Sequence, residues 1–240
     1  MQSLTAYQVV QVWEWGHGQH AVDRALLLLA QAFPALPREQ LANLTVGQRN
    51  RRLLLLRQMT FGDQLDGMGT CPACSEQLTF QIQVSELILP EPNQTTFSFS
   101  AENLHLQMRL PNSHDLAAIV GLDGQAAGRE LLLKRCVLDA RRGDQPLPRL
   151  PDALIPLLTD AVTEHDPQAE MRFALQCPAC GEAWSALFDI VTFLWSEIDG
   201  RARRLSRDVH LLAQAYGWRE VDILAMSATR RQLYLEWIGT

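Results

Sequence analysis

The tetrapeptide Cys-Pro-Ala-Cys occurs twice in this chain, as Cys71–Cys74 and as Cys177–Cys180. Two such pairs supply the four thiolates of a tetrahedral zinc site, and each pair spans one tight turn, so both of its sulfurs can face one ion. Gly181 follows the second pair and lets the backbone turn around a metal. We therefore predict one structural zinc ion per chain, with Cys71, Cys74, Cys177 and Cys180 as its ligands.

Thiol–disulfide exchange is a competing interpretation of the same cysteines. It requires a strand before the pair and a helix after it, because a helix N-terminus lowers the pKa of the first thiol. Strand-like sequence follows both pairs instead, at residues 78–80 and 183–188, which favours two zinc knuckles. Disulfide-bonded or metal-free cysteines are further alternatives. We expect no signal peptide and a reducing compartment, which disfavours disulfides.

The spacing of the two pairs predicts an interrupted zinc ribbon. A plain ribbon separates its pairs by roughly 15–20 residues, whereas about a hundred residues lie between Cys74 and Cys177. The expected divisions are an N-terminal helical region (1–66), a first zinc knuckle with a small antiparallel sheet (67–110), a helical insertion (111–168), a second zinc knuckle (169–191) and C-terminal helices (192–240).

The elements that must position the cysteines follow from apolar periodicity. Three-and-four spacing predicts two helices in residues 6–33 and one from Gln48 to about Gln58, capped by Thr45. A loop is expected over residues 61–69. Alternating residues predict strands at 78–84, 96–99 and 104–110, which we expect to form a sheet seated on the zinc. Residues 112–167 are expected to be helical.

The most regular pattern lies near the C-terminus. Apolar residues recur there at steps of three and four and predict one helix of roughly 22 residues: Trp195, Ile198, Ala202, Leu205, Val209, Leu212 and Tyr216. We favour packing on the protein's own core over docking on another subunit. Gly217 suits a left-handed cap and Ser227 an N-cap. The fold class is α+β, mostly helical, with a small antiparallel zinc ribbon split by a helical insertion and a long C-terminal amphipathic helix.

No pattern for catalysis is present. The six histidines form no metalloenzyme motif, and there is neither a phosphate-binding glycine loop nor a nucleophile elbow. Four cysteines fill all four positions of a zinc ion and leave none for a catalytic water. Cys136, in the apolar run 131–138, is expected to be a small buried hydrophobe. We therefore expect no enzyme and no small-molecule substrate.

Composition narrows the choice of partner. Hydrophobic residues make up 47% of the 240 residues, which is enough for a buried core. The formal net charge of −6 opposes nucleic acid, because binding a duplex requires a basic surface. The basic clusters 49–52, 201–204 and 230–231 are expected to be solvated or in salt bridges. The apolar runs are too short to cross a membrane.

Several motifs resemble one protein family. Leu44-Thr45-Val46-Gly47-Gln48-Arg49 and the first Cys-Pro-Ala-Cys pair look like its front half; its back half is matched by the second pair, by Phe193-Leu194-Trp195-Ser196-Glu197 and by Tyr216-Gly217-Trp218. With these motifs the protein is similar to the baseplate (hub) assembly proteins of contractile-tailed phages and phage-derived contractile injection systems.

The resemblance implies a non-enzymatic, chaperone-like assembly factor or a minor tail component. Its partners would be other baseplate or tail proteins. It would act in the bacterial cytoplasm during assembly, or stay in the finished tail or injection particle. The alternative is a regulatory zinc-ribbon protein that binds nucleic acid. Candidate interface anchors are aromatic (Trp13, Trp15, Trp218, Tyr234 and Trp237), whereas Trp195 is assigned to the core.

Overall fold

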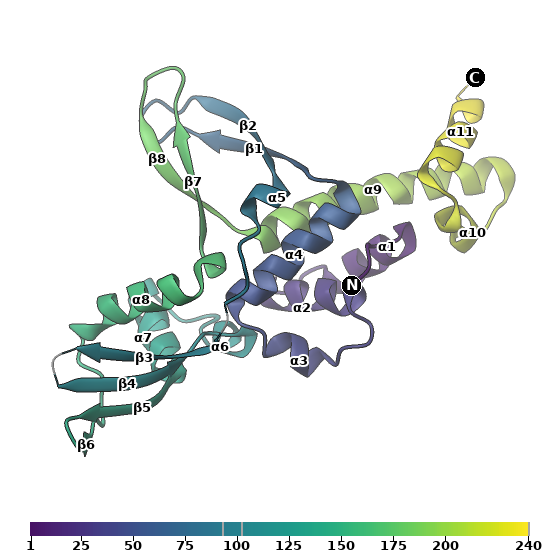
Figure 1. Cartoon of the computed structure of the whole chain (residues 1–240). Helices are drawn as coiled ribbons and strands as arrows, with labels where there is room; N and C mark the ends of the chain where they lie inside the picture. Colours follow the sequence, from purple (N-terminus) through teal and green to yellow (C-terminus); the bar gives the residue numbers. More distant parts are fainter. Residues whose placement is uncertain (93, 102, 240) are drawn as a thin grey trace.

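A computed structural model describes residues 1–92, 94–101 and 103–239 of the protein. In Figure 1 a central group of helices lies between a pair of β-hairpins, a separate sheet with helices of its own, and a short helical arm at the C-terminus. Helices make up 53% of the described residues, and every described strand pair is antiparallel. The predicted α+β class is therefore confirmed.

The central helices bury one continuous apolar core. They are α1 (Ala6–Gly16), α2 (Ala21–Ala32), α3 (Arg38–Ala42), α4 (Val46–Phe61) and α9 (Ile190–Tyr216). Thr5 and Thr45 each form a capping box with the glutamine three residues further on, which fixes where α1 and α4 begin. The predicted break between the first two helices and the predicted Thr45 cap are confirmed.

Helix α9 packs against α1, α2 and α4, and near its end against α10 (Glu220–Ala225) and α11 (Ala228–Ile238). It has 27 residues, somewhat more than expected. Four residues of the predicted seam are at most 1% exposed: Ile198, Ala202, Leu205 and Leu212. The seam thus packs on the protein's own core. Gly217, at a φ of 68°, ends α9, and Ser227 caps α11, both as predicted.

Two β-hairpins project from the central helices (Figure 1). One pairs β1 (Gln64–Thr70) with β2 (Gln77–Gln83), and the other pairs β7 (Met171–Gln176) with β8 (Ala183–Phe188). The expected loop at 61–69 is therefore wrong from Gln64 onward. Gly67 and Gly69 lower the strand propensity of this segment. The Phe80 ring on the facing strand occupies the space beside Gly67, where a Cβ would lie 2.4 Å from the ring.

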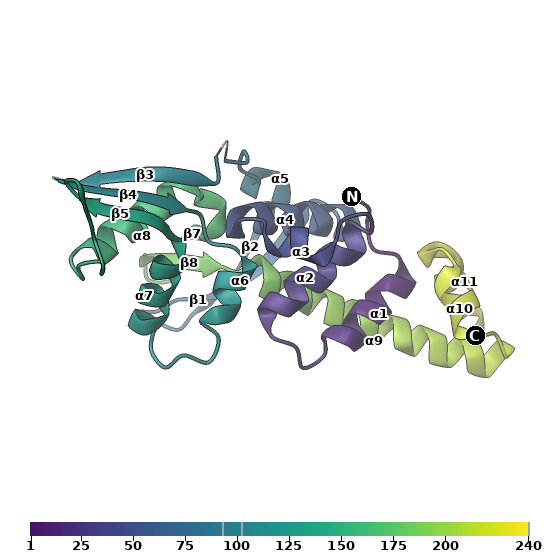
Figure 2. The ribbon, with the colours of Figure 1, turned by 90° about the horizontal axis from the view of Figure 1, so that it is seen from below.

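The remaining sheet has the order β3-β4-β5-β6. Its strands are β3 (Thr96–Ala101), β4 (Leu104–Arg109), β5 (Val137–Arg142) and β6 (Gln145–Pro146). One face packs on α7 (Gln125–Cys136) and α8 (Leu154–His165), which Figure 2 shows beside the sheet. We expected this sheet to sit on the zinc site; instead it buries a second apolar core with the helices that follow it. The stretch 112–167 is also not wholly helical, because it contains β5 and β6.

Short elements connect these regions, and buried polar contacts hold the connections. They are α5 (Val84–Leu87), α6 (Ser113–Ala118) and a 3-10 turn (Pro167–Ala169). Asp166, just before that turn, is fully buried and accepts a 2.9 Å hydrogen bond from the N–H of Gly47 in the first turn of α4. Burial raises the pKa of the Asp166 carboxyl, although the bonds from Gly47 and Thr45 oppose this.

A buried ion pair joins α4 to α9. Arg57 is 3% exposed and holds Glu197 with two hydrogen bonds, of 2.9 and 2.6 Å. A third guanidinium nitrogen donates to the carbonyls of Gly62 and Gln64, at the entry to the first hairpin. None of the described helices combines the length and apolarity needed to cross a membrane.

Candidate metal centre

Each predicted cysteine pair forms the tip of one hairpin. Cys71–Cys74 connects β1 to β2, and Cys177–Cys180 connects β7 to β8. The two tips share one hydrogen-bond pattern: the N–H of each first cysteine donates to the carbonyl five residues on, Glu76 at 2.9 Å and Glu182 at 2.8 Å. The sequence thus builds the same knuckle twice.

The fifth residue of each knuckle turns the backbone back with a positive φ. Gly181 has a φ of 79°, as its place after the second pair suggested. Ser75 takes the same role in the first knuckle with a φ of 62°, where a residue other than glycine is uncommon. In each knuckle this residue's N–H donates to the carbonyl of the first cysteine, at 3.0 Å from Ser75 and 2.9 Å from Gly181.

The four thiol sulfurs converge although the two pairs are more than a hundred residues apart. Cys71 Sγ lies 3.6 Å from Cys180 Sγ, Cys74 Sγ lies 3.6 Å from Cys177 Sγ, and all four sulfurs are within 4.8 Å of one another. Tetrahedral zinc with bonds of about 2.3 Å requires sulfurs about 3.8 Å apart. The four cysteines can therefore hold one metal ion.

The electrostatics of the cluster favour a cation. Burial disfavours the Cys71 thiolate, but hydrogen bonds from the backbone of Cys74 and Ala73 and from neighbouring thiols lower the pKa of Cys71 to about 7. The pKa of Cys74 is raised to about 12: a backbone hydrogen bond at Glu76 lowers it, and the neighbouring sulfurs and burial outweigh that effect. The pKa of Cys180 is also raised. Four sulfurs this close cannot all ionise unless a positive ion joins them.

The bases of the hairpins are held by packing. The ring of Phe80 on β2 meets Phe173 on β7 edge to face at 5.6 Å, and Phe173 contacts Phe188 at 4.9 Å. Phe173 and Phe188 belong to the central core. Beyond these rings most hairpin residues are exposed, so at the tips only the buried Cys71 and Cys177 lie inward. A metal ion would therefore tie together the parts of the hairpins that packing leaves free.

The structure does not have the helix after each cysteine pair that thiol–disulfide exchange requires. Strands β1 and β7 do precede the two cysteine pairs, but strands β2 and β8 follow them. Neither pair therefore lies at a helix N-terminus, which is the usual source of an activated thiolate. All five cysteines are free thiols. Cys136 is fully buried with Met108, Leu133 and Leu158 in the second core, as predicted.

The predicted aromatic anchors divide into two groups. Trp13 is half-buried and donates a 2.7 Å hydrogen bond to Asp199. Trp218 and Tyr234 meet edge to face within the C-terminal arm, with their ring centroids 4.8 Å apart. Trp15 and Trp237 stay 50% and 58% exposed. Trp195 is half-buried against the central core rather than fully inside it.

Sequence reasoning missed the burial of Arg49, which we expected to be solvated or in a salt bridge like the rest of its cluster. Arg49 is 5% exposed. The signal was available: Val46, Arg49, Leu53 and Leu56 lie at helical spacing on one face of α4, and the other three are apolar. Because the apolar stripe of α4 faces the interior, an arginine within that stripe is predicted to be buried.

The fold is α+β, and two cysteine-tipped hairpins bring four thiol sulfurs together at one place. A sequence profile described as "T4 bacteriophage base plate protein" matches residues 25–145, from α2 to β6. The chain belongs to this family. The match includes Cys71 and Cys74, whereas Cys177 and Cys180 lie beyond it. No curated protein and no solved structure matches the sequence.

Proposed function

We propose that the protein is a non-enzymatic structural or assembly protein of a contractile-tail or injection-system baseplate. Its membership of the base plate family is the observation that carries this proposal. It acts through contacts with other baseplate or tail proteins, in the bacterial cytoplasm during assembly or as part of the finished particle. The chaperone-like role and the hub location belong to the same proposal.

A structural zinc ion is the second part of the proposal. Four cysteine sulfurs within 4.8 Å of one another suit a closed tetrahedral zinc site, and thiolates are the ligands that such sites prefer. The ion would hold two hairpin tips that otherwise share little packing. A two-stranded hairpin is marginally stable alone, so the clamp gives this projecting part of the molecule a fixed shape.

Exposed apolar residues support a role in protein contacts. Val221, Leu233 and Trp237 on α10 and α11 are 52%, 44% and 58% exposed, all within the short C-terminal arm. Exposed aromatic and apolar residues grouped on one element are typical of interface anchors. The arm projects from the central helices (Figure 1), where a neighbouring subunit can reach it.

Deletion of the gene that encodes the protein, in the phage or bacterium that makes the tail, tests the role. Tails with incomplete baseplates should accumulate in electron micrographs, and the wild-type gene should restore complete ones. The Cys177→Ser variant should restore fewer than the Cys136→Ser variant, because only the first removes a metal ligand. Normal baseplates without the protein would refute an assembly role.

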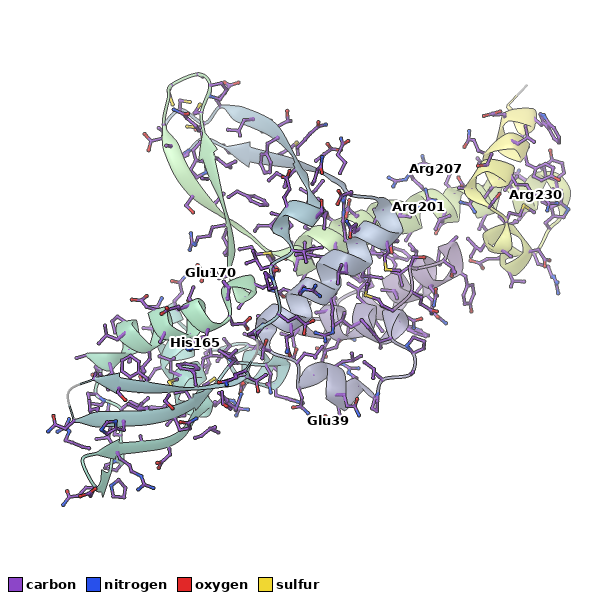
Figure 3. The ribbon with its side chains drawn as sticks, in the orientation of Figure 1. Glu39, His165, Glu170, Arg201, Arg207 and Arg230 are labelled. Carbon is purple, nitrogen blue, oxygen red and sulfur yellow. The ribbon has the colours of Figure 1, made fainter. Side chains whose placement is uncertain are left out.

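Nucleic-acid binding is the alternative function, and evidence for it would overturn this proposal. Figure 3 shows Arg201 and Arg207 on α9 and Arg230 on α11, so three arginines lie along the C-terminal helices. Fluorescence anisotropy with duplex DNA at two salt concentrations decides between them. Tight binding that weakens steeply with salt would favour nucleic acid, whereas weak binding at both concentrations supports the baseplate role.

A further inference from the structure

Charge is divided unevenly along the chain. Residues 200–239 contain seven arginines and four aspartates or glutamates, which gives this basic segment a formal charge of +3. Because the whole chain has a formal charge of −6, the remainder carries −9. The basic segment consists of the C-terminal arm and the part of α9 that carries it, and it projects from the central helices (Figure 1). An acidic protein therefore extends a basic segment away from its core.

A groove of about 580 Å³ lies at the base of the arm, where the first turn of α1 meets α9, α10 and the start of α11. Its apolar wall includes Tyr7, Val221 and Met226. Tyr7 is 50% and Val221 52% exposed, so this wall is open to a partner. The charged side chains among the described residues of the wall are those of Arg201 and Arg231, and no aspartate or glutamate is among them.

Arg231 is a compensated cation. It is 3% exposed, and it donates hydrogen bonds to the Asp208 carboxylate at 3.0 Å and to the carbonyl of Met226 at 3.3 Å. This ion pair joins α11 to α9. The charge of Arg231 is therefore explained by the fold of the arm.

Arg201 lies beside this ion pair without an anion of its own. It is half-buried, and in the described part of the chain its guanidinium forms neither a hydrogen bond nor an ion pair. Burial lowers the pKa of Arg201, the charges of Arg231 and Arg204 lower it further, and Asp208 opposes them with a smaller effect. Repulsion from two arginines thus exceeds the attraction of Asp208 at this position.

Arg204, one turn further along α9, adds a second uncompensated charge. It is exposed, and none of the described carboxylates lies within ion-pair distance of it. Arg203, between the two, is bound to Asp199 at 2.8 Å and is therefore compensated. Arg201 and Arg204 together present two positive charges next to an open apolar wall.

We propose that this groove binds an acidic segment of another tail protein. Two aspartate or glutamate side chains of the segment meet Arg201 and Arg204. Its apolar side chains cover Val221 and Met226. Two positive charges favour acidic side chains over a C-terminal carboxylate, which provides a single charge. Complementary charge also directs the partner to this place, because the acidic remainder of the protein repels it.

Nucleic acid is the other polyanion that two arginines could attract, but the surroundings oppose it. Its phosphates gain nothing from the apolar wall of the groove. A duplex long enough to bind would also extend over the acidic remainder of the protein, which repels it. An acidic protein segment satisfies both the charges and the apolar wall.

The test is photo-crosslinking of the full-length protein in the cells that assemble the tail, with Val221→p-benzoylphenylalanine. Leu138→p-benzoylphenylalanine is the matched control, because Leu138 is 56% exposed but lies on β5, outside the basic segment. Mass spectrometry of the crosslinked peptides identifies what occupies the groove. We expect a tail-protein segment with two or more acidic residues among apolar ones, and at least about fivefold less of this product from the control position.

Three arginine variants, each combined with the substitution at Val221, complete the test. Arg201→Gln and Arg204→Gln should each lower the yield of the crosslink about fivefold, as expected for the loss of one ion pair. Arg141→Gln, at an exposed arginine of β5 that pairs with Asp139, should leave the yield unchanged. Arg204 is exposed, so its variant still decides if Arg201→Gln fails to fold.

Four results would overturn the proposal. They are a crosslink to a second copy of this chain or to nucleic acid, a crosslinked segment without acidic residues, an undiminished yield in both arginine variants of the groove, and no crosslink at all. The inference rests on the proposed function only in taking the partner to be a tail protein. An acidic segment of some other protein would support the groove and count against the baseplate role, whereas incomplete baseplates without the protein would support that role whatever the groove binds.

Discussion

Replacing Cys177 with serine should remove the metal ion and open the tips of both hairpins. Cys177 is 1% exposed at its hairpin tip, and its sulfur lies 3.6 Å from that of Cys74 on the other hairpin. Serine retains the shape of the side chain but is a poor zinc ligand, so three cysteines would remain. The central helices should stay folded, because their core does not depend on the tips.

The magnitude follows from the length of the loop that the proposed metal ion would close. In the fully unfolded protein the link between Cys74 and Cys177 closes a loop of about 103 residues, which is worth about 4.7 kcal/mol by conformational entropy. For local opening of the tips, the contact between Phe80 and Phe173 already holds the bases. The loop then has roughly ten residues, and the link is worth about 2.7 kcal/mol.

Hydrogen exchange measured by mass spectrometry separates these two openings. A loss of about 2.7 kcal/mol should make the amides at the tips exchange about 100-fold faster. The affected peptides are 68–79 and 175–184, whereas peptides of α9 from 191 to 205 should change little. Native mass spectrometry should show one zinc ion in the wild type and none in Cys177→Ser.

Cys136→Ser is the matched control, because Cys136 is equally buried but lies in the second core, away from the cluster. It should keep its zinc and its hairpin protection, and lose roughly 1–3 kcal/mol of stability from a buried hydroxyl. The reasoning is refuted if Cys177→Ser keeps one zinc ion with protected tips, or if Cys136→Ser loses the ion as well.

Three further substitutions, with Gly200→Ala as a control for the first, test contacts around α4. Gly47→Ala should cost roughly 1–3 kcal/mol in urea unfolding, because its Cβ would lie 1.7 Å from an Asp166 oxygen; Gly200→Ala, with 3.5 Å to its nearest neighbour, should be neutral or stabilising. Arg57→Met should cost about 3–5 kcal/mol, since it leaves Glu197 without its partner, and an unchanged midpoint would contradict this. The raised pKa of Asp166 means that the native state binds more protons than the unfolded state above pH 3.8, so this residue's contribution to stability falls as pH rises towards the raised pKa. Asp166→Asn should remove that fall. Between about pH 4 and pH 7, the wild type should therefore lose more free energy of unfolding than Asp166→Asn, or gain less.

Local signals in the sequence predicted much of the helical structure. The capping residues Thr45 and Ser227 and the left-handed Gly217 mark helix ends because each satisfies backbone groups that the helix itself leaves open. Strands β2, β3 and β4 follow from alternation. These features depend on residues within a few positions of one another, so they can be recognised without a fold.

Strands β1 and β5 were missed because their pairing depends on distant residues. The glycines of β1 disfavour a strand until the Phe80 ring packs over them. Strand β5 is short and carries exposed charges at Asp139 and Arg141, and it becomes a strand by pairing with β4. Strands β3 and β4 pack against α7 and α8 and not on the cysteines. The sequence does not show which of these surfaces the apolar face of the sheet covers.

The sequence by itself determined the two Cys-Pro-Ala-Cys turns and most of the helices, because spacing within a turn fixes them. Only the tertiary structure decided that the two knuckles meet, since core packing at Phe80 and Phe173 brings together hairpins more than a hundred residues apart. It also decided that Arg49 faces a groove between four helices while Arg57, two turns further on, finds a carboxylate. Both outcomes depend on which apolar surfaces join, and that is settled when the whole protein folds.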